Sequence, residues 1–532
     1  MVTFQDLRDA HIGGLRDAAD GWLRLARKVS QFEERARAEV TRPIAGSGWE
    51  GDAAGAALAE LHRAEQEIAL AALLVENVRL TLQRAAEEFQ AAQDELRGVL
   101  DDAAALRLRV LDDGSVELPP LEEYERHDPW FIQQRLQAQA REVAERIEAA
   151  VRRATEADAR YAAALAEFAA TDPAAPYAWA DAAADSRLAA CLAGVDESAI
   201  PSPGTDPKRV AEWWQSLTED QRRLYTQLFP QRVGALDGLP ATDRDQANRL
   251  ALRERIGELA NKNPYLLSDF EKRDLARLRA LQARLESGGY AGGRGLYLLG
   301  FDPHGDGKAI VAVGNPDTAA HTAVYVPGTA TALDDMPGQI NRAERLADNA
   351  DSMTRDVAGD VAVVAWLGYD TPEDLARATQ EGRAQDGAAA LDRFVDGLRV
   401  AQGPEHRHIT ALGHSYGSTL VGETASRHGL AVDDIVTAGS PGMRVDHASD
   451  LGIDPRHVWA GAAEDDPISG WAGNFVHGQE PSDPEFGANR FHVDTHGHSG
   501  YWDPDTESLR NQARIIAGLY DRVTYDHGRP PR

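Results

Sequence analysis

The chain has 532 residues, more than a single hydrophobic core usually organises, so roughly two or three domains are expected. Its 86 Asp and Glu residues outnumber the 56 Lys and Arg residues and give a formal net charge of −30, which argues against nucleic acid or an anionic membrane surface as a partner. The single cysteine, Cys191, excludes any intramolecular disulfide.

The N-terminal sequence lacks the pattern of a Sec-type signal peptide. Its first letters, MVTFQD, contain no basic region that is followed by an apolar stretch. No apolar run along the chain reaches the length of a membrane span. We therefore expect a protein that is cytoplasmic or leaves the cell without a Sec signal.

Residues 1–170 carry helical periodicity and are expected to form an all-α domain. From Leu61 to Val99 apolar residues recur by threes and fours over more than five heptads, which is typical of a coiled-coil seam. An earlier amphipathic helix packs against this seam in an antiparallel hairpin, with Trp49-Glu50-Gly51 at the turn. A small β-hairpin is expected from Leu106 to Pro119, followed by a third helix from Ile132 to Phe168.

A boundary follows the helical region. Prolines and glycines punctuate residues 171–207 around one Ala-rich helix, so this stretch is interpreted as a linker with a short helix. Residues 208–287 are again helical, in shorter pieces, and form a preface to the residues that follow. The remaining residues, 288–532, are expected to form the catalytic domain.

The periodicity changes after this preface from helices to short apolar strands. Buried strands that alternate with helices indicate an α/β fold with a mostly parallel sheet covered on both faces. The strands are expected at 296–299, 309–313, 321–326, 361–366, 408–412, 435–438 and 457–460, with a terminal helix at about 508–521.

The pentapeptide Gly413-His414-Ser415-Tyr416-Gly417 stands where a strand ends and a helix begins. This is the context of the G-x-S-x-G turn, in which two glycines allow a strained backbone that displays the serine hydroxyl. The helix N-terminus also favours developing negative charge. Ser415 is therefore the candidate nucleophile.

Such a nucleophile needs an acid and then a histidine further along the chain. Asp466 follows the last predicted strand and precedes a proline, so we assign it as the acid, with Asp465 as an open alternative. His498 is assigned as the base, since an imidazole must take the hydroxyl proton while a carboxylate holds the imidazole tautomer. No cofactor is required.

The oxyanion of the intermediate needs hydrogen-bond donors. We assign the backbone amide of Tyr416, which follows the nucleophile, and that of Thr329, in a Gly-containing loop after an earlier strand. The long irregular segment 469–495 is expected to shape an apolar pocket. The residues assigned to substrate binding are Trp471, Phe475 and Trp366.

Other interpretations stay open for the same residues. Ser415 can be a helix-capping serine of an inactive, hydrolase-like fold that serves as an interaction protein. His492, Asp494, His496 and His498 resemble a metal-ligand cluster, but their spacing matches no known signature and a metal leaves the serine turn unexplained, so no metal is assigned.

Residues 290–525 resemble the α/β-hydrolase superfamily, and more narrowly an actinobacterial branch with no assigned substrate. The letters that carry this resemblance are VPGT at 326–329, AWLGY at 365–369 and GHSYG at 413–417, with WW at 213–214 and LDGLP at 236–240. The N-terminal hairpin, with Trp49-Glu50-Gly51, resembles the small WxG helical proteins exported by type VII secretion. This second resemblance implies export by such a route and a helical or secretion partner for residues 1–170.

The resulting interpretation is a serine hydrolase, an esterase or lipase acting on a small-molecule or lipid ester. An amidase, peptidase or thioesterase shares the acyl-enzyme and stays an alternative. So does an inactive secretion-associated protein.

Overall fold

The computed structural model describes residues 2–45, 49, 52–121, 128–173, 175, 178–287, 295–354, 360–379, 382–469 and 477–526. The chain divides into two compact units. The first comprises Met1–Thr41 and Gly55–Asp196, and the second comprises Arg42–Ala54 and Glu197–Arg532. The first unit therefore ends inside the stretch that the sequence predicts to be a linker.

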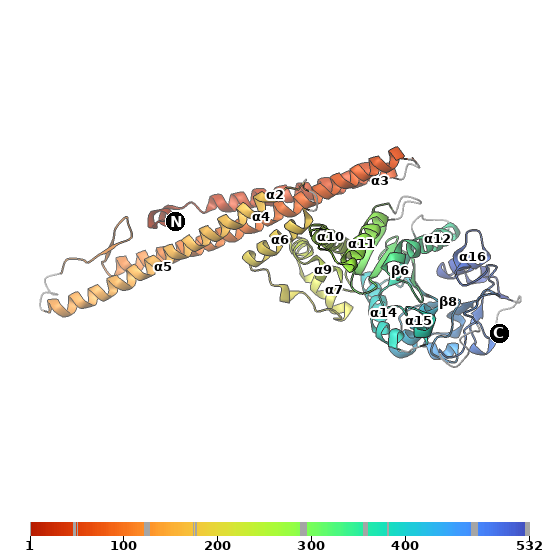
Figure 1. The fold of residues 1–532 in the computed structure, drawn as a ribbon. Helices are drawn as coiled ribbons and strands as arrows, with labels where there is room; N and C mark the ends of the chain where they lie inside the picture. The colour runs from red at the N-terminus through yellow and green to blue at the C-terminus, as the bar shows by residue number, and fades with distance from the viewer. Residues whose placement is uncertain are drawn as a thin grey trace. The chain divides into compact units, whose positions relative to one another are not determined.

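The first unit is helical, as its apolar periodicity predicts. Its helices are α1 (Phe4–Asp9), α2 (Gly13–Ala36), α4 (Asp52–Ala105), α5 (Pro129–Ala170) and α6 (Trp179–Ala193), with a π-helical turn at Arg37–Thr41. Figure 1 shows α4 and α5 lying side by side. Buried small and branched residues, among them Leu96 on α4 and Ile147 on α5, belong to one core cluster that joins them. The expected hairpin is present as β1 (Arg109–Val110) and β2 (Val116–Glu117).

The second unit begins with helices and continues with a mixed sheet. The helices are α3 (Arg42–Ala45), α7 (Pro207–Ser216), α8 (Glu219–Leu228), α9 (Pro230–Gly234), α10 (Ala241–Ala260) and α11 (Asp269–Ser287). The strands are β3 (Leu296–Asp302), β4 (Lys308–Val313), β5 (His321–Val326), β6 (Val361–Leu367), β7 (His408–His414), β8 (Asp434–Ala438), β9 (Val458–Gly461) and β10 (Asn489–Arg490).

The eight strands lie in the order β10-β9-β8-β7-β5-β6-β4-β3. β5 pairs in parallel with both β6 and β7, and the parallel pairing continues through β8, β9 and β10. β4 pairs antiparallel with β6 and with β3, so the antiparallel part is confined to one edge. The predicted mostly parallel sheet is confirmed.

Helices cover both faces of the sheet. α12 (Met336–Thr354) and α16 (Glu507–Ile516) pack on one face, and α14 (Gly382–Ala401) and α15 (Tyr416–His428) on the other (Figure 1). A short helix, α13 (Leu375–Ala378), precedes α14. Every residue of β6 is buried, as expected for a strand with helices on either side. The carboxyl ends of the parallel strands therefore lie together, along the side of the sheet where these strands end.

Side chains of α10 form hydrogen bonds with the backbone of the edge strand β3. The carboxylate of Asp245 accepts the N–H of Leu298 at 2.7 Å, and the amide of Asn248 donates to the carbonyl of the same residue at 3.0 Å. The guanidinium of Arg249 donates to the carbonyl of Leu296 at 2.7 Å. A helix of the predicted preface is thus bonded directly to the sheet.

Within the described parts of the chain, no helix is both long enough and apolar enough to cross a lipid bilayer.

Candidate active site

Ser415 occupies a sharp turn between β7 and α15. Its backbone has φ 52° and ψ −130°, a conformation that a residue with a side chain rarely adopts. The flanking glycines make this turn possible. A Cβ on Gly413 would lie 2.4 Å from the Cα of Ser418, and one on Gly417 would lie 2.1 Å from the carbonyl oxygen of Val326. The turn has the geometry that the pentapeptide predicts.

The loop after β5 lies against Ser415. A Cβ on Gly328 would lie 2.6 Å from the Cβ of Ser415 and 3.1 Å from its Oγ, so the backbone there approaches the hydroxyl closely. Thr329 follows and is partly exposed, and no hydrogen bond to a described residue occupies its N–H. The N–H of Ala330 donates to the carbonyl of Pro372 at 2.7 Å and fixes the loop. Tyr416 is the first residue of α15, so the two residues assigned as oxyanion donors flank Ser415.

Asp466 and His498 are joined directly. The Nδ1 atom of His498 lies 2.9 Å from each carboxylate oxygen of Asp466. Asp466 also accepts hydrogen bonds from the hydroxyl of Tyr501 at 2.6 Å and from the N–H of Ile468 at 2.8 Å. Burial opposes the charge on this carboxylate, but the hydrogen bonds from His498 and Tyr501 outweigh it and lower the pKa of Asp466. The carboxylate therefore stays ionised at neutral pH.

The neighbouring Asp465 points elsewhere. Its carboxylate is exposed, accepts the N–H of Gly497 at 2.8 Å and lies 3.4 Å from the imidazole of His496. Asp465 therefore holds the loop that carries His498, whereas Asp466 contacts the imidazole itself. Of the two carboxylates weighed from the sequence, the geometry of a relay fits Asp466.

His498 packs beside the turn through His414, the residue before Ser415. Their ring centroids lie 4.7 Å apart, and the Nε2–H of His414 donates to the carbonyl of His498 at 2.8 Å. Burial, with the nearby His498, lowers the pKa of His414 to about 3, so this imidazole is neutral. Among the described residues, no hydrogen bond joins Ser415 Oγ to His498. Catalytic hydrogen bonds of this kind often form fully only when substrate binds.

Sequence reasoning did not assign roles to His414 or Tyr501. His414 could have been singled out from the sequence because it is part of the pentapeptide and directly precedes Ser415. Tyr501 lies three residues after His498, within the segment already chosen for the histidine.

Asp494, which the sequence groups with the nearby histidines, has another role. The carboxylate of Asp494 accepts the N–H groups of Glu507 and Ser508, both at 3.0 Å, and so caps the N-terminus of α16. Across the described ranges, no group of three or more His, Cys, Asp or Glu side chains is arranged to hold a metal ion.

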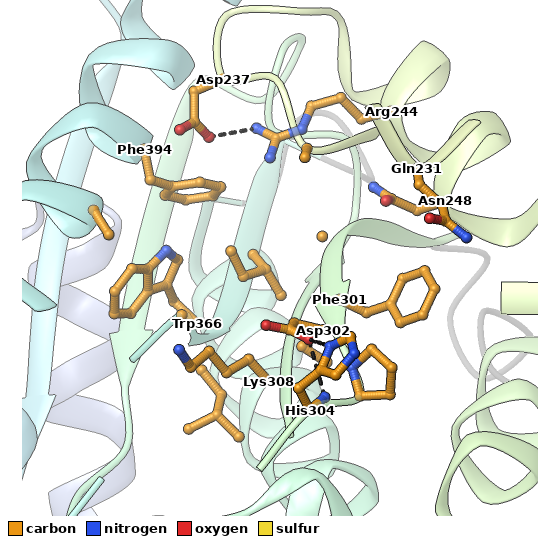
Figure 2. Close-up of a pocket in the computed structure, with 18 of the residues that line it drawn as sticks. Gln231, Asp237, Arg244, Asn248, Phe301, Asp302, His304, Lys308, Trp366 and Phe394 are labelled. Carbon is orange, nitrogen blue, oxygen red and sulfur yellow. Dashed lines mark hydrogen bonds and ion pairs between the residues drawn. The ribbon is translucent and has the colours of Figure 1, made fainter. Parts of the chain in front are cut away.

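Of the three residues assigned to substrate binding, the structure describes only Trp366. Trp471 and Phe475 fall outside the described residues. Trp366 is buried on β6, stacks on Tyr369 and lines a cavity of about 640 Å³ (Figure 2). None of Ser415, Asp466 and His498 lines that cavity. The assignment of Trp366 to the substrate of Ser415 stays a prediction.

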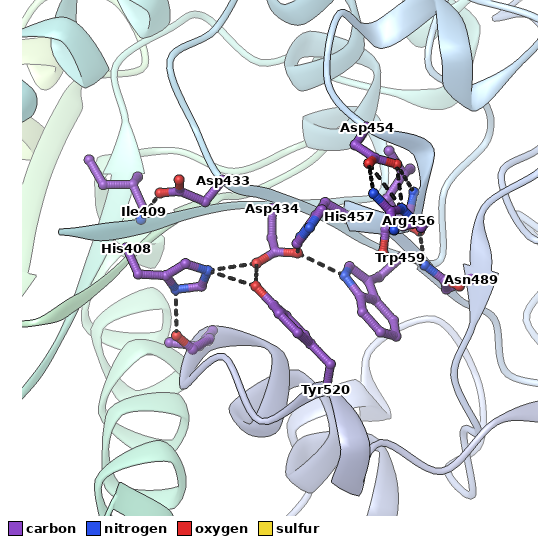
Figure 3. Close-up of polar contacts among 12 residues, drawn as sticks. His408, Ile409, Asp433, Asp434, Asp454, Arg456, His457, Trp459, Asn489 and Tyr520 are labelled. Carbon is purple, nitrogen blue, oxygen red and sulfur yellow. Dashed lines mark hydrogen bonds and ion pairs between the residues drawn. The ribbon is translucent and has the colours of Figure 1, made fainter. Parts of the chain in front are cut away.

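A second polar cluster lies at the N-terminal ends of the parallel strands, on the side of the sheet opposite to Ser415 (Figure 3). Its centre is the fully buried Asp434. One carboxylate oxygen contacts His408 and Tyr520, each at 2.6 Å, and the other contacts His457 and the indole of Trp459, each at 2.9 Å. Burial disfavours the charged imidazole of His408, but the Asp434 contact prevails and raises its pKa. This cluster ties three strands and the C-terminal segment together.

Comparison with known proteins identifies the family. A family model described as alpha/beta hydrolase matches residues 302–474, a stretch that contains Ser415 and Asp466 and ends before His498. The uncharacterized protein Mb0988c of Mycobacterium bovis is 35% identical over 222 residues, which cover 40% of this chain and 77% of that protein. The chain belongs to the alpha/beta hydrolase superfamily.

The chain is also similar to a further relative, of which it spans less than two thirds, and to a solved structure. The uncharacterized protein Rv2079 of Mycobacterium tuberculosis is 31% identical over 379 residues, 62% of this chain, and the match spans 58% of that relative's length. Among solved structures, the esterase LipW from Mycobacterium marinum aligns with 47% of this chain and 88% of its own, at 14% identity and a TM-score of 0.31.

Proposed function

We propose that this protein is a serine hydrolase that cleaves carboxylic esters through an acyl-enzyme. The observation that supports it most is the buried Asp466 carboxylate on Nδ1 of His498, beside a serine held at φ 52°. In α/β-hydrolases these groups follow the order serine, acid, histidine along the chain, and the relay needs them close together in space. Membership of the α/β-hydrolase superfamily supports the reaction class.

The proposed reaction has two halves. Ser415 Oγ attacks the ester carbonyl while Nε2 of His498 takes the hydroxyl proton, and Asp466 holds the Nδ1–H and stabilises the imidazolium. The oxyanion accepts hydrogen bonds from the N–H groups of Tyr416 and Thr329. The intermediate collapses, His498 gives its proton to the departing alcohol, and the acyl group stays on Ser415. Water then repeats the sequence and releases the carboxylic acid.

The same carboxylate–imidazole pair protonates an alcohol or an amine leaving group. An ester is favoured here because an alcohol leaves more readily than an amine. A small-molecule or lipid ester is therefore proposed, while an amidase, peptidase or thioesterase would use the same acyl-enzyme.

Labelling with a fluorophosphonate tests the nucleophile, since this probe reacts covalently with an activated serine. The wild-type chain should be labelled, and Ser415→Ala should not. Ser426→Ala is the matched control, because that serine is on α15, the helix that follows Ser415, and its hydroxyl donates only within the helix, to Gly422 and Glu423. A panel of acyl esters of increasing chain length then defines the substrate.

Two results would redirect the proposal. Equal labelling of wild type and Ser415→Ala would place the nucleophile elsewhere. No labelling of the folded wild type would favour the alternative, a secretion-associated or interaction protein. The exposed Trp130 and Phe131 at the start of α5 are candidate contacts for a partner of such a protein.

A further inference from the structure

The cavity that Trp366 lines has the size and the mostly apolar lining of a small-molecule binding site. It lies between α10, the outer strands β3 and β4, and α14, and its volume of about 640 Å³ is in the range of small-molecule sites. Figure 2 shows Trp366 and Phe394 on one wall and Phe301 on the opposite wall. Ile310 and Ala390 add to this apolar lining.

Two guanidinium groups share one carboxylate at this cavity. Asp237 contacts Arg244 at 3.0 Å and Arg393 at 3.1 Å, and all three residues line the space. The side chains of Arg244 and Asp237 are only 6% and 10% exposed, so water screens them weakly. These two guanidinium groups therefore carry one more positive charge than the carboxylate that they share.

Among the other acidic groups nearby, Asp392 interacts electrostatically with Arg393, and burial raises its pKa. Glu258 pairs with Arg255 at 2.9 Å, and Asp302 contacts His304 at 2.6 Å. Asp317, which interacts electrostatically with Arg244, accepts the N–H of Ala241 at 2.6 Å, and burial raises its pKa. Lys308 adds a further cation to the lining, 3.4 Å from Asp370.

Two buried donors in the lining also have no acceptor. Trp366 is 1% exposed, and its indole N–H has no partner in the described part of the chain. The Nε–H of Arg244 likewise has no acceptor there. A buried donor without an acceptor is destabilising, so these two groups add unmet hydrogen-bonding capacity beside the cavity.

We propose that this cavity binds a small carboxylic acid with an apolar body, at a site separate from Ser415. Its carboxylate accepts hydrogen bonds from the Arg244 end of the cavity, and its apolar body packs against Trp366, Phe394 and Phe301. The site does not depend on catalysis at Ser415.

The charges favour a monoanion over a phosphate. Asp237 lies within hydrogen-bond distance of both guanidinium groups, and Asp302 lines the same space, so a second negative charge on the ligand would be repelled. The aromatic walls favour an apolar body over a sugar or a peptide backbone.

Calorimetric titration of the full chain with sodium decanoate tests the site. We expect saturable binding of one decanoate per chain, at least tenfold tighter than binding of 1-decanol, which has the same tail without the charge. Labelling Ser415 with the fluorophosphonate beforehand should leave this affinity within twofold. Tighter binding of decyl phosphate than of decanoate would overturn the assignment of a monoanionic ligand.

Two variants locate the binding site. Arg244→Gln removes the buried cation and should weaken binding at least tenfold, whereas Arg249→Gln, on the same helix and also ion-paired, should change it less than twofold. Ala390→Phe fills the cavity and should abolish binding, whereas Ala389→Phe, exposed on the same helix, should not.

Thermal unfolding of each variant by circular dichroism shows whether it is folded, and Ala390→Phe keeps the test decisive if Arg244→Gln is unstable. Absence of saturable binding to wild type, or unchanged affinity in the folded Ala390→Phe variant, would overturn the proposal and leave a cavity filled by water.

Discussion

Tyr501 links the proposed acid to the strand before it. Its hydroxyl donates to Asp466 at 2.6 Å and accepts the N–H of Ala463 at 3.0 Å. Because this donation helps to lower the pKa of Asp466, it extends the pH range in which the carboxylate is charged. Tyr501 is therefore a positioning residue for the pair of Asp466 and His498.

Tyr501→Phe should raise the pH at which the Asp466 carboxylate takes up a proton, as measured by NMR titration of that carboxyl group. The change removes a donor that favours the charged carboxylate, so the pKa of Asp466 rises and its charge is lost at a higher pH than in wild type. At pH 8, where the carboxylate is ionised in both proteins, the loss of kcat/KM should stay below about tenfold. Tyr520→Phe is the control, since that hydroxyl contacts Asp434 at the far edge of the sheet. An unchanged titration of the Asp466 carboxyl in Tyr501→Phe would contradict this role.

Asp466→Asn should lower kcat far more than Asp465→Asn. An amide at 466 cannot hold the Nδ1–H tautomer of His498 as a carboxylate does, and in serine proteases the equivalent change costs about 10⁴-fold. Asp465 contacts only the loop around His498, so its amide variant should lose less than about tenfold. Steady-state kinetics on one ester measures both, and the reverse ranking would move the acid by one residue.

The sequence could place these groups in order but could not show their contacts. The sharp turn at Ser415 was predictable because a turn between a strand and a helix leaves a local pattern of glycines. The choice between Asp465 and Asp466 was not, because adjacent residues in a turn point in different directions that depend on the packed structure. His414 and Tyr501 act across the fold, and such contacts leave no spacing in the sequence.

At the scale of elements, the turn at Ser415 depends on the absence of side chains beside it. Gly417→Ala would place a Cβ 2.1 Å from the carbonyl oxygen of Val326 and force β5 away from α15. We expect a loss of about 1–3 kcal/mol in the free energy of unfolding, and loss of fluorophosphonate labelling.

Gly338→Ala on α12 is the matched control, because a Cβ there meets nothing within 4 Å. This change should be neutral or should stabilise by about 0.5–1 kcal/mol, since alanine favours a helix over glycine. Chemical denaturation measures both variants. Equal stability of the two would show that the turn tolerates a side chain.

Most strands were predictable because buried strands form continuous apolar runs. The runs at 408–412 and 361–366 correspond to β7 and β6 within two residues. β10 was not predicted, because Asn489 and Arg490 form only two residues of strand and neither is apolar. Its pairing with β9 depends on tertiary position, which no local pattern encodes.

At the scale of the whole molecule, the two compact units predict that the hydrolase folds without the long helices. A chain that begins at Ser202 keeps α7, which packs on α14, and α10, which packs on β3. It should be soluble and should hydrolyse a short-chain ester within about tenfold of the full chain, a difference of about 1.4 kcal/mol in the barrier.

The shortened chain loses Arg42–Ala54, which belongs to the second unit. Circular dichroism and ester hydrolysis distinguish the outcomes. Aggregation, or a folded product without activity when the full chain is active, would show that the N-terminal helices are part of the enzyme rather than a separate partner-binding domain.

The bonds from α10 to β3 have a consequence for solubility. The outer edge of a sheet carries free N–H and carbonyl groups that can template pairing with a second molecule, and proteins block such edges to avoid aggregation. Here Asp245, Asn248 and Arg249 occupy those groups along β3. Side chains of α10 thus make hydrogen bonds that a further strand would otherwise make with β3, so another molecule cannot pair there. We therefore expect a shortened chain to need α10, because one that starts at Leu296 would expose unpaired backbone groups of β3 and aggregate.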